Sequence, residues 1–316
     1  MTAVTDIEAL GRRRPSLPSW PRRLPRLRRV ERVQAPDAIA TAASYGLTIL
    51  SAALLALLFN LAIVSQLQHT TAQHTLYDRL RVSLAEGSAP IGQLDAHGHL
   101  VARGTPVALL EIPELGLKEV VVEGTASRQT KVGVGHRPDT PLPGQPGVSV
   151  LMGRAAAYGG VFGRIDRLQP GKTFTVTTGQ GVSTYKVIGA RKGTVKLPAL
   201  DASAGRLTLV TAAGSPFLPH GVRRVDADLV STSYPRPPIA FAAGVIDDSE
   251  QGLAGDPSRV FSLSWLLELM VVVAVGAVWV WKRWSHQATL IVFGPILAAV
   301  GLACADRICD LLPNLM

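Results

Sequence analysis

Cysteine is nearly absent from this sequence. The only two cysteines are Cys304 and Cys309, and none occurs in residues 1–303. This excludes a thiol nucleophile and paired CxxC metal ligands from almost the whole chain. The motifs GxxxxGK[ST] and HExxH and an Asp-rich calcium loop are also missing, so we expect no cofactor and no bound metal. His97 and His99 lie only two residues apart in a connector and do not make a convincing metal site.

Positive charge is concentrated at the start of the chain. The formal net charge is +9, and residues 1–44 hold nine Arg against four acidic residues, a local net charge of +5. This tail is rich in Arg and Pro and has no periodicity, which predicts a mostly disordered cytoplasmic segment. Because the basic residues precede an apolar run, they favour contact with anionic lipid headgroups and argue against a nucleic-acid partner.

Apolar residues are gathered in three long runs, consistent with a mean hydropathy of +0.25. The first run has 20 residues without a charge, about the length that crosses a bilayer as a helix, and it is too long and begins too late for a cleaved signal peptide. We expect a stalk and connector over residues 65–103 and a linker over residues 231–260. The predicted transmembrane helices are residues 45–64, 261–281 and 288–305.

The orientation of these spans follows from their flanking charges. Lys282 and Arg283 lie between the last two spans, so that joint is predicted to be cytoplasmic. The N-terminus is then cytoplasmic and the middle domain extracytoplasmic, in a multi-pass protein of the cell membrane. Glu268 lies within the second span, and we interpret it as a residue near the membrane interface. Cys304 and Cys309 are predicted to reach the outer side, where a disulfide and two free thiols both remain open.

Residues 104–230 have the pattern of a small β domain. ALLEIPELGLKEVVVEGT predicts two short strands around a turn, and KTFTVTT and STYKVIGARKG predict a hairpin joined at Gly179-Gln180-Gly181. RLTLVTAAGSPF and RRVDADLV supply the last two strands. Periodicity alone predicts no more than a mostly β fold.

Residues 141–171, PLPGQPGVSVLMGRAAAYGGVFGRIDRLQPG, read as turn, buried strand, loop, helix and turn. PGQPG, the apolar strand, Gly153, Tyr158-Gly159, Phe162 and the ending LQPG together resemble the sortase family, the cysteine transpeptidases of Gram-positive cell envelopes, and most closely its actinobacterial class E. The pattern IPxLGLxxVVVEG resembles the first strand pair of the same family. The resemblance spans residues 104–230. It implies a mostly β fold, a sortase-like closed β-barrel with short helices, to which the sequence adds three transmembrane helices.

The resemblance also implies three catalytic residues: a Cys nucleophile, a His that exchanges protons and an Arg that holds the substrate. In this chain Ala212 occupies the Cys position, Arg154 the His position, and the Arg position falls near Val222. A methyl group cannot act as a nucleophile, and an Arg stays protonated near neutral pH. We therefore expect a catalytically inactive protein that recognises a peptide or protein partner, or assists assembly, at the bacterial envelope. The predicted binding-groove residues are Arg154, Tyr158, Thr211, Arg223, Arg224 and His136.

Two other functions remain open from the sequence. In the first, Ser215 and His220 act as a relocated nucleophile and base, with His136 available as a further base and Asp139 as an orienting group, and the chain is an active transpeptidase or hydrolase. In the second, the three spans are the working part of a larger membrane complex and the barrel is its sensor. In each case membrane lipids and an envelope or membrane protein are the expected partners.

Overall fold

The computed structural model describes residues 47, 51, 54–192, 197–215, 218–240, 244–283 and 286–316. The predicted basic tail, 1–44, and most of the first half of the span predicted at 45–64 lie outside these residues. The following description concerns the described residues within 47–316.

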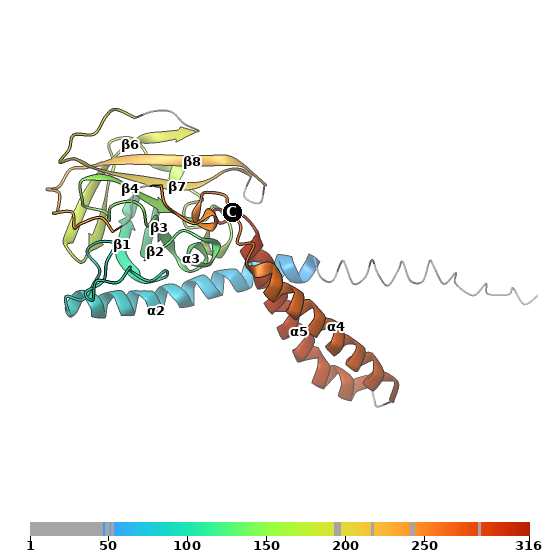
Figure 1. Cartoon of the computed structure of the whole chain (residues 1–316). Coiled ribbons are helices and arrows are strands. Elements are labelled where there is room, and N and C mark those ends of the chain that lie inside the picture. Colours follow the sequence, from blue (N-terminus) through green and yellow to red (C-terminus); the bar gives the residue numbers. More distant parts are fainter. Residues whose placement is uncertain are drawn as a thin grey trace, which may run out of the picture. The chain divides into compact units, whose positions relative to one another are not determined.

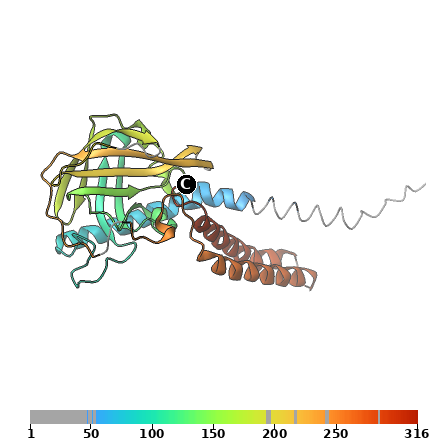
Figure 2. The same cartoon turned by 45° about the horizontal axis from the view of Figure 1, so that its top comes forward.

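Eight strands form a closed β-barrel (Figures 1 and 2). Around the barrel the order is β1-β2-β3-β4-β7-β8-β6-β5, and β1 pairs with β5 to close it. The pairs β2–β3 and β4–β7 are parallel and the others are antiparallel. The strands are β1 (Pro106–Ile112), β2 (Leu117–Glu123), β3 (Val134–His136), β4 (Gly147–Met152), β5 (Thr173–Thr178), β6 (Gly181–Lys192), β7 (Gly205–Ser215) and β8 (Leu218–Leu229). This confirms the fold class expected from the sequence.

Short helices connect the strands of the barrel. Gly116 has a φ of 63° at the turn between β1 and β2, a conformation that favours glycine, which explains the Pro-Glu-Leu-Gly signal in the sequence. The connecting helices are η2 (Pro113–Leu115), α3 (Ser127–Val132), η3 (Tyr158–Gly160) and η4 (Ile165–Arg167), and a further short helix, η5 (Asp248–Glu250), follows the last strand.

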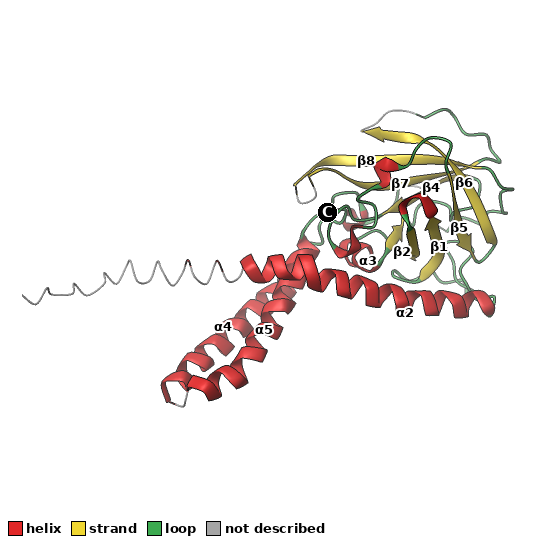
Figure 3. Cartoon of the chain, turned by 180° about the vertical axis from the view of Figure 1, so that it is seen from behind, coloured by secondary structure: helices red, strands yellow, loops and turns green. Residues whose placement is uncertain are grey.

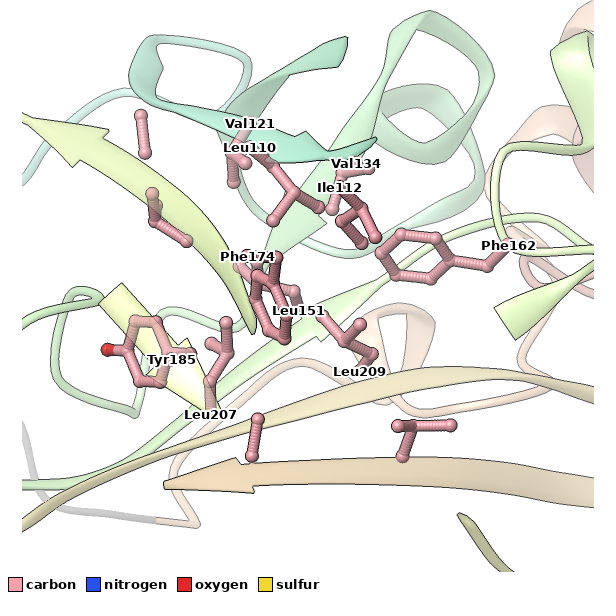
Figure 4. Close-up of a cluster of buried hydrophobic side chains, with 14 of the residues drawn as sticks. Leu110, Ile112, Val121, Val134, Leu151, Phe162, Phe174, Tyr185, Leu207 and Leu209 are labelled. Carbon is pink, nitrogen blue, oxygen red and sulfur yellow. The ribbon is translucent and has the colours of Figure 1, made fainter. Parts of the chain in front are cut away.

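The main hydrophobic core fills the interior of the barrel (Figure 4). Side chains alternate between the two faces of each strand, so Leu207 and Leu209 of β7 point inward while Val210 joins a second cluster. Phe174 and Tyr185 stack within the core with ring centroids 5.7 Å apart. β4 therefore contributes Leu151 to the barrel core, whereas the neighbouring Met152 faces the outside of the barrel and joins the second cluster.

A long helix packs along the outside of β1 and β2 (Figure 3). This helix, α2 (Ser65–Ala85), follows the π-helical turn η1 (Asn60–Val64) without a break. Its Leu76 and Leu80 pack on Val120 and Val122, whereas the intervening Val121 belongs to the barrel core. Both faces of β2 are thus buried, which explains its nearly continuous run of valines.

Two further helices, α4 (Arg259–Arg283) and α5 (His286–Leu311), lie side by side (Figures 1 and 3). By length and composition, three helices are candidate membrane spans, at Leu54–Ala85, Arg259–Trp281 and Gln287–Leu311. The narrower boundaries predicted from the sequence and the direction in which the spans cross remain predictions. Cys304 and Cys309 are both buried and unpaired on α5.

Candidate functional site

The loop that follows β4 is fixed against the end of β7. The backbone N–H of Gly153 donates to the carbonyl of Val210 (3.0 Å), and Thr211 Oγ1 donates to the carbonyl of Gly153 (2.8 Å). A Cβ at position 153 would lie 2.7 Å from the ring of Phe162, so only glycine fits there. This arrangement brings Arg154 to the end of β7.

Arg154 is fully enclosed, with only 1% of its surface exposed. Its Nη2 donates to the Oγ (2.7 Å) and the carbonyl (3.2 Å) of Ser127, and its Nη1 donates to the carbonyl of Met316 (3.3 Å). The guanidinium lies 5.0 Å from the centre of the Tyr158 ring. Burial lowers the pKa of Arg154 to about 10, so the group is still a fixed cation at neutral pH and exchanges no proton there. Its donors are directed at this chain's own residues.

Tyr158 belongs to a buried group of charges that joins the barrel to α5. Its hydroxyl donates to Asp306 (3.2 Å), and burial raises the pKa of the phenol, which keeps that proton in place. Lys131 Nζ on α3 contacts Asp306 (3.0 Å) and Asp310 (2.6 Å). Lys131 and Asp310 are nearly inaccessible to solvent, and such pairs are costly to break because the remaining charge stays buried. The end of α5 is therefore held firmly on α3.

After α5 ends, residues 312–316 enter the site; we call these residues the docked segment. Leu315 is 0% exposed and packs with Met152, Val210 and Ala212. The backbone N–H of Ala155 donates to the carbonyl of Leu315 (2.9 Å). The side chain of Leu315 consequently covers the position at which the family's nucleophile is expected, and leaves Ala212 only 7% exposed.

Asn314 anchors the docked segment on its other side. Its backbone N–H donates to the carbonyl of Ala254 (2.8 Å). Its side-chain Nδ2 donates to the carbonyls of Thr125 (2.7 Å) and Gln251 (2.9 Å), and the residue is 0% exposed. The docked segment is thus held from both sides by the backbone of the barrel domain and of the linker before α4.

The β8 residues predicted for the groove divide between two faces of the sheet. Val222 lies opposite Ala212 and packs with the same cluster, and Arg224 points to that face as well because side chains alternate along a strand. Arg223 points to the other face, where its Nη1 forms an ion pair with Asp166 (2.8 Å). Arg223 is the cross-strand neighbour of Thr211 and Arg224 is that of Val210, so both arginines lie beside the end of β7, on opposite faces of the sheet.

His136 is a buried residue on β3, with both ring nitrogens engaged. Nδ1 lies 2.8 Å from the carboxylate of Glu123, and Nε2 lies 3.1 Å from the carbonyl of Pro141. Burial favours the neutral imidazole, but the Glu123 carboxylate outweighs it, so the pKa of His136 is raised above its usual 6.5. Through these contacts His136 connects β3 to Glu123 at the end of β2 and to Pro141 in the loop that follows β3.

Ser215 and His220 lie on the hairpin that joins β7 to β8, and both are exposed. Ser215 pairs with Leu218 in the sheet, and the ring of His220 lies beside Gly214. Among the described atoms there is no hydrogen bond between the Ser215 hydroxyl and the His220 ring. The arrangement lacks the nucleophile-to-base contact that a relocated catalytic pair requires.

Within the described residues, no cluster of three or more His, Cys, Asp or Glu side chains is placed to hold a metal ion. The sequence reasoning found the positions at the end of β7 but missed the docked segment and Ser127. Residues 312–316 show no periodicity, and Ser127 belongs to a one-and-a-half-turn helix. Their role depends on contacts between distant parts of the chain that no local pattern reports.

Comparison with known proteins finds a domain model that matches part of the barrel. Residues 110–219, from the middle of β1 to the start of β8, match the model of the Sortase domain. Among the curated proteins no match is found. The match of the family model agrees with the resemblance noted in the sequence.

Several solved sortases are similar to this chain. Sortase E from Streptomyces avermitilis is 28% identical over 42% of this chain and 93% of its own, with a TM-score of 0.34. Sortase E1 from Streptomyces coelicolor, solved with a tripeptide in the active site, is 21% identical over 42% and 93%, with a TM-score of 0.37. Sortase D5 from Clostridium perfringens is 19% identical over 51% and 99%, with a TM-score of 0.42. This chain is a sortase-fold protein, in which a sortase domain is combined with three candidate membrane helices.

Proposed function

We propose that this protein is a membrane-anchored sortase-fold binding protein that recognises a peptide or protein partner, or assists assembly, at the bacterial cell envelope without transpeptidation. One observation carries the proposal. At the end of β7 a methyl group, Ala212, is covered by Leu315, and the adjacent Arg154 is a buried cation bound to Ser127. Ala212 offers no nucleophile and Arg154 exchanges no proton near neutral pH, and the thiol of Cys309, which packs with Tyr158, is itself 0% exposed.

The surroundings of Ala212 support binding of an extended peptide. The docked segment already lies there as a short stretch of chain, held by backbone hydrogen bonds at Ala155 and Ala254 and by an apolar contact at Ala212. Backbone hydrogen bonds combined with a side-chain pocket are a general means of peptide recognition. An envelope or membrane protein with a suitable segment is the partner we propose.

The experiment measures peptide cleavage and, separately, the reactivity of Ser215 as a relocated nucleophile. The purified full-length chain in detergent is incubated with a sorting-type peptide and, separately, with a serine-reactive probe. We expect neither cleavage of the peptide nor specific labelling. Ser215→Ala is the matched control, because it removes the rival nucleophile at an exposed position. Cleavage by the unmodified chain, or labelling lost in Ser215→Ala, would establish the enzyme and overturn the proposal.

A second function, in which the barrel acts as the sensor of a membrane complex, is favoured by a different observation. The end of α5 is attached to the barrel domain through Lys131, Asp306 and Asp310 as well as through the docked segment. A change at the barrel site would therefore act directly on a candidate membrane helix. The test is to mutate the barrel site alone and to measure, by quantitative co-purification, the proteins that bind α4 and α5. Loss of these partners would support this function.

A further inference from the structure

The docked segment makes the contacts of a bound peptide ligand, although it is part of the same chain. Its two backbone hydrogen bonds run to different sides of the site, to Ala155 after β4 and to Ala254 in the linker. Asn314 and Leu315 are both 0% exposed, whereas the preceding residues 312 and 313 are half-buried. Met316 is buried as well, at 5% exposed, and its carbonyl accepts from Arg154 (3.3 Å), while Asn314 and Leu315 are the two fully enclosed side chains of the docked segment.

The site around Asn314 selects the chemistry of its occupant. Two carbonyl oxygens, from Thr125 and Gln251, lie 2.7 and 2.9 Å from the side-chain nitrogen. A primary carboxamide supplies two N–H donors to such a pair, whereas a carboxylate of the same shape would place negative charge against both oxygens. The site therefore accepts Asn and rejects Asp.

The neighbouring pocket selects size and apolarity. Leu315 packs against Met152, Val210 and Ala212, with Val222 and Leu253 at the edge of the same cluster. The methyl group of Ala212 leaves the room that a branched aliphatic side chain fills, and a larger residue at position 212 would occupy it. The two subsites together specify a carboxamide followed by an aliphatic side chain of about the size of leucine.

The contacts of the docked segment continue into the end of α5, which Lys131 also holds through Asp306 and Asp310. The carbonyl of Cys309 accepts from Ser127 Oγ (3.4 Å), which is the same hydroxyl that accepts from Arg154 (2.7 Å). The carbonyl of Asp310 accepts from the backbone N–H of Asp256 (3.0 Å). These contacts continue directly from the docked segment into the last turn of the helix, so the occupancy of the site and the attachment of α5 are coupled.

We infer that residues 312–316 are a displaceable internal occupant, and that the site binds in their place an extended external peptide with a carboxamide side chain followed by a leucine-sized aliphatic one. This inference rests on the proposed binding function and specifies its ligand. A tethered occupant competes at an effective concentration of about the millimolar range, so the external peptide succeeds when it is itself concentrated at the same membrane. The partner is then a membrane-attached or envelope protein that presents such a segment.

The test uses the full-length chain in detergent and a fluorescein-labelled peptide with the sequence of residues 310–316. Binding is measured by fluorescence anisotropy to the unmodified chain and to Leu315→Asp, which removes the internal apolar contact and leaves the barrel residues intact. We expect Leu315→Asp to bind the peptide at least about tenfold more tightly, because the competitor is lost. A peptide with Asp at the place of Asn314 is the matched control and is expected not to bind.

The outcomes separate this inference from the proposed function. Equal affinity of the two chains for the peptide, with no binding of the control peptide, overturns the internal occupant and leaves peptide binding intact. No binding to either chain overturns peptide recognition itself. A measurement without any substitution accompanies these: hydrogen exchange of the unmodified chain at saturating peptide is expected to lose the protection of the Asn314 amide. Unchanged protection at saturation overturns the displacement.

Discussion

The covering of position 212 by the docked segment makes a quantitative prediction about the reactivity of a thiol placed there. The change is Ala212→Cys, alone and together with Leu315→Ala. In the single variant we expect slow alkylation, because Ala212 is 7% exposed under a Leu315 that is itself 0% exposed.

The magnitude follows from the burial of Leu315. Replacement of a fully buried leucine by alanine costs about 2 to 5 kcal/mol in a protein core. Only the docking of residues 312–316 depends on this contact, and their hydrogen bonds through Asn314 remain, so we take about 2 to 4 kcal/mol as the loss of docking free energy. At about 1.4 kcal/mol for each factor of ten, the undocked population rises about 30- to 700-fold. The alkylation rate is expected to rise by the same factor when redocking is faster than labelling.

The assay follows alkylation of the full-length chain with a maleimide, and peptide masses separate position 212 from Cys304 and Cys309. Ser203→Cys, which lies exposed before β7, is the matched control, and its rate is expected to be the same with and without Leu315→Ala. Two results refute the reasoning. A thiol at position 212 that reacts as fast as one at position 203 shows that nothing covers it. A rate unchanged by Leu315→Ala shows that opening of the barrel, and not undocking, exposes it.

Three further predictions concern topology, chemistry and pH. A reporter that is active only outside the cytoplasm should be active when fused after Ser231 and silent when fused at Lys282, and the reverse pattern at either place contradicts the proposed topology. Cleavage of a sorting-type peptide should appear only when Ala212→Cys is combined with Arg154→His, because the nucleophile and the proton-exchanging group act as a unit; cleavage by Ala212→Cys alone shows that another group supplies the proton. Because the folded state raises the pKa of His136, its stabilising charge is present below about pH 6.5 and is lost as the pH rises through the folded-state pKa. The free energy of unfolding should therefore fall over that pH rise in the unmodified chain and much less in His136→Gln, and equal pH profiles from chemical denaturation would contradict the assigned role.

The fold was largely predictable from local sequence patterns. The strands of the barrel carry alternating apolar residues or short apolar runs, and the turns carry glycines such as Gly116, so each element is specified by its own residues. The motifs around Gly153 then identify the end of β4, and the end of β7 lies beside it because the two strands are parallel neighbours. These positions are reliable because they are fixed by backbone geometry, such as the close approach of Gly153 to Phe162.

The contents of the site were not predictable in the same way. Arg154 was expected to line a binding groove, and its contacts with Ser127 and Met316 depend on residues far away along the chain. The sequence of residues 312–316 gives no signal that it docks, since the hydrogen bonds of Asn314 go to backbone carbonyls, which any residue possesses. Such contacts are specified by the assembled fold and not by residue type.

The π-helical turn η1 sets the angular relation between the two parts of the long first helix. A π turn accommodates one more residue than the α-helical turn it replaces, and each residue in an α-helix advances the side chains by about 100°. The stripe that carries Leu76 and Leu80 is therefore rotated by about that angle relative to a helix continuing regularly from residue 59. Deletion of one residue from Asn60–Val64 would let the turn become α-helical without changing the angular relation of the two parts, whereas conversion of the turn to α-helix at its full length would rotate the upstream face by about 100° while the barrel contacts are kept. The extra residue in this π turn thus fixes which side of the first candidate span faces other helices when the barrel is held in place.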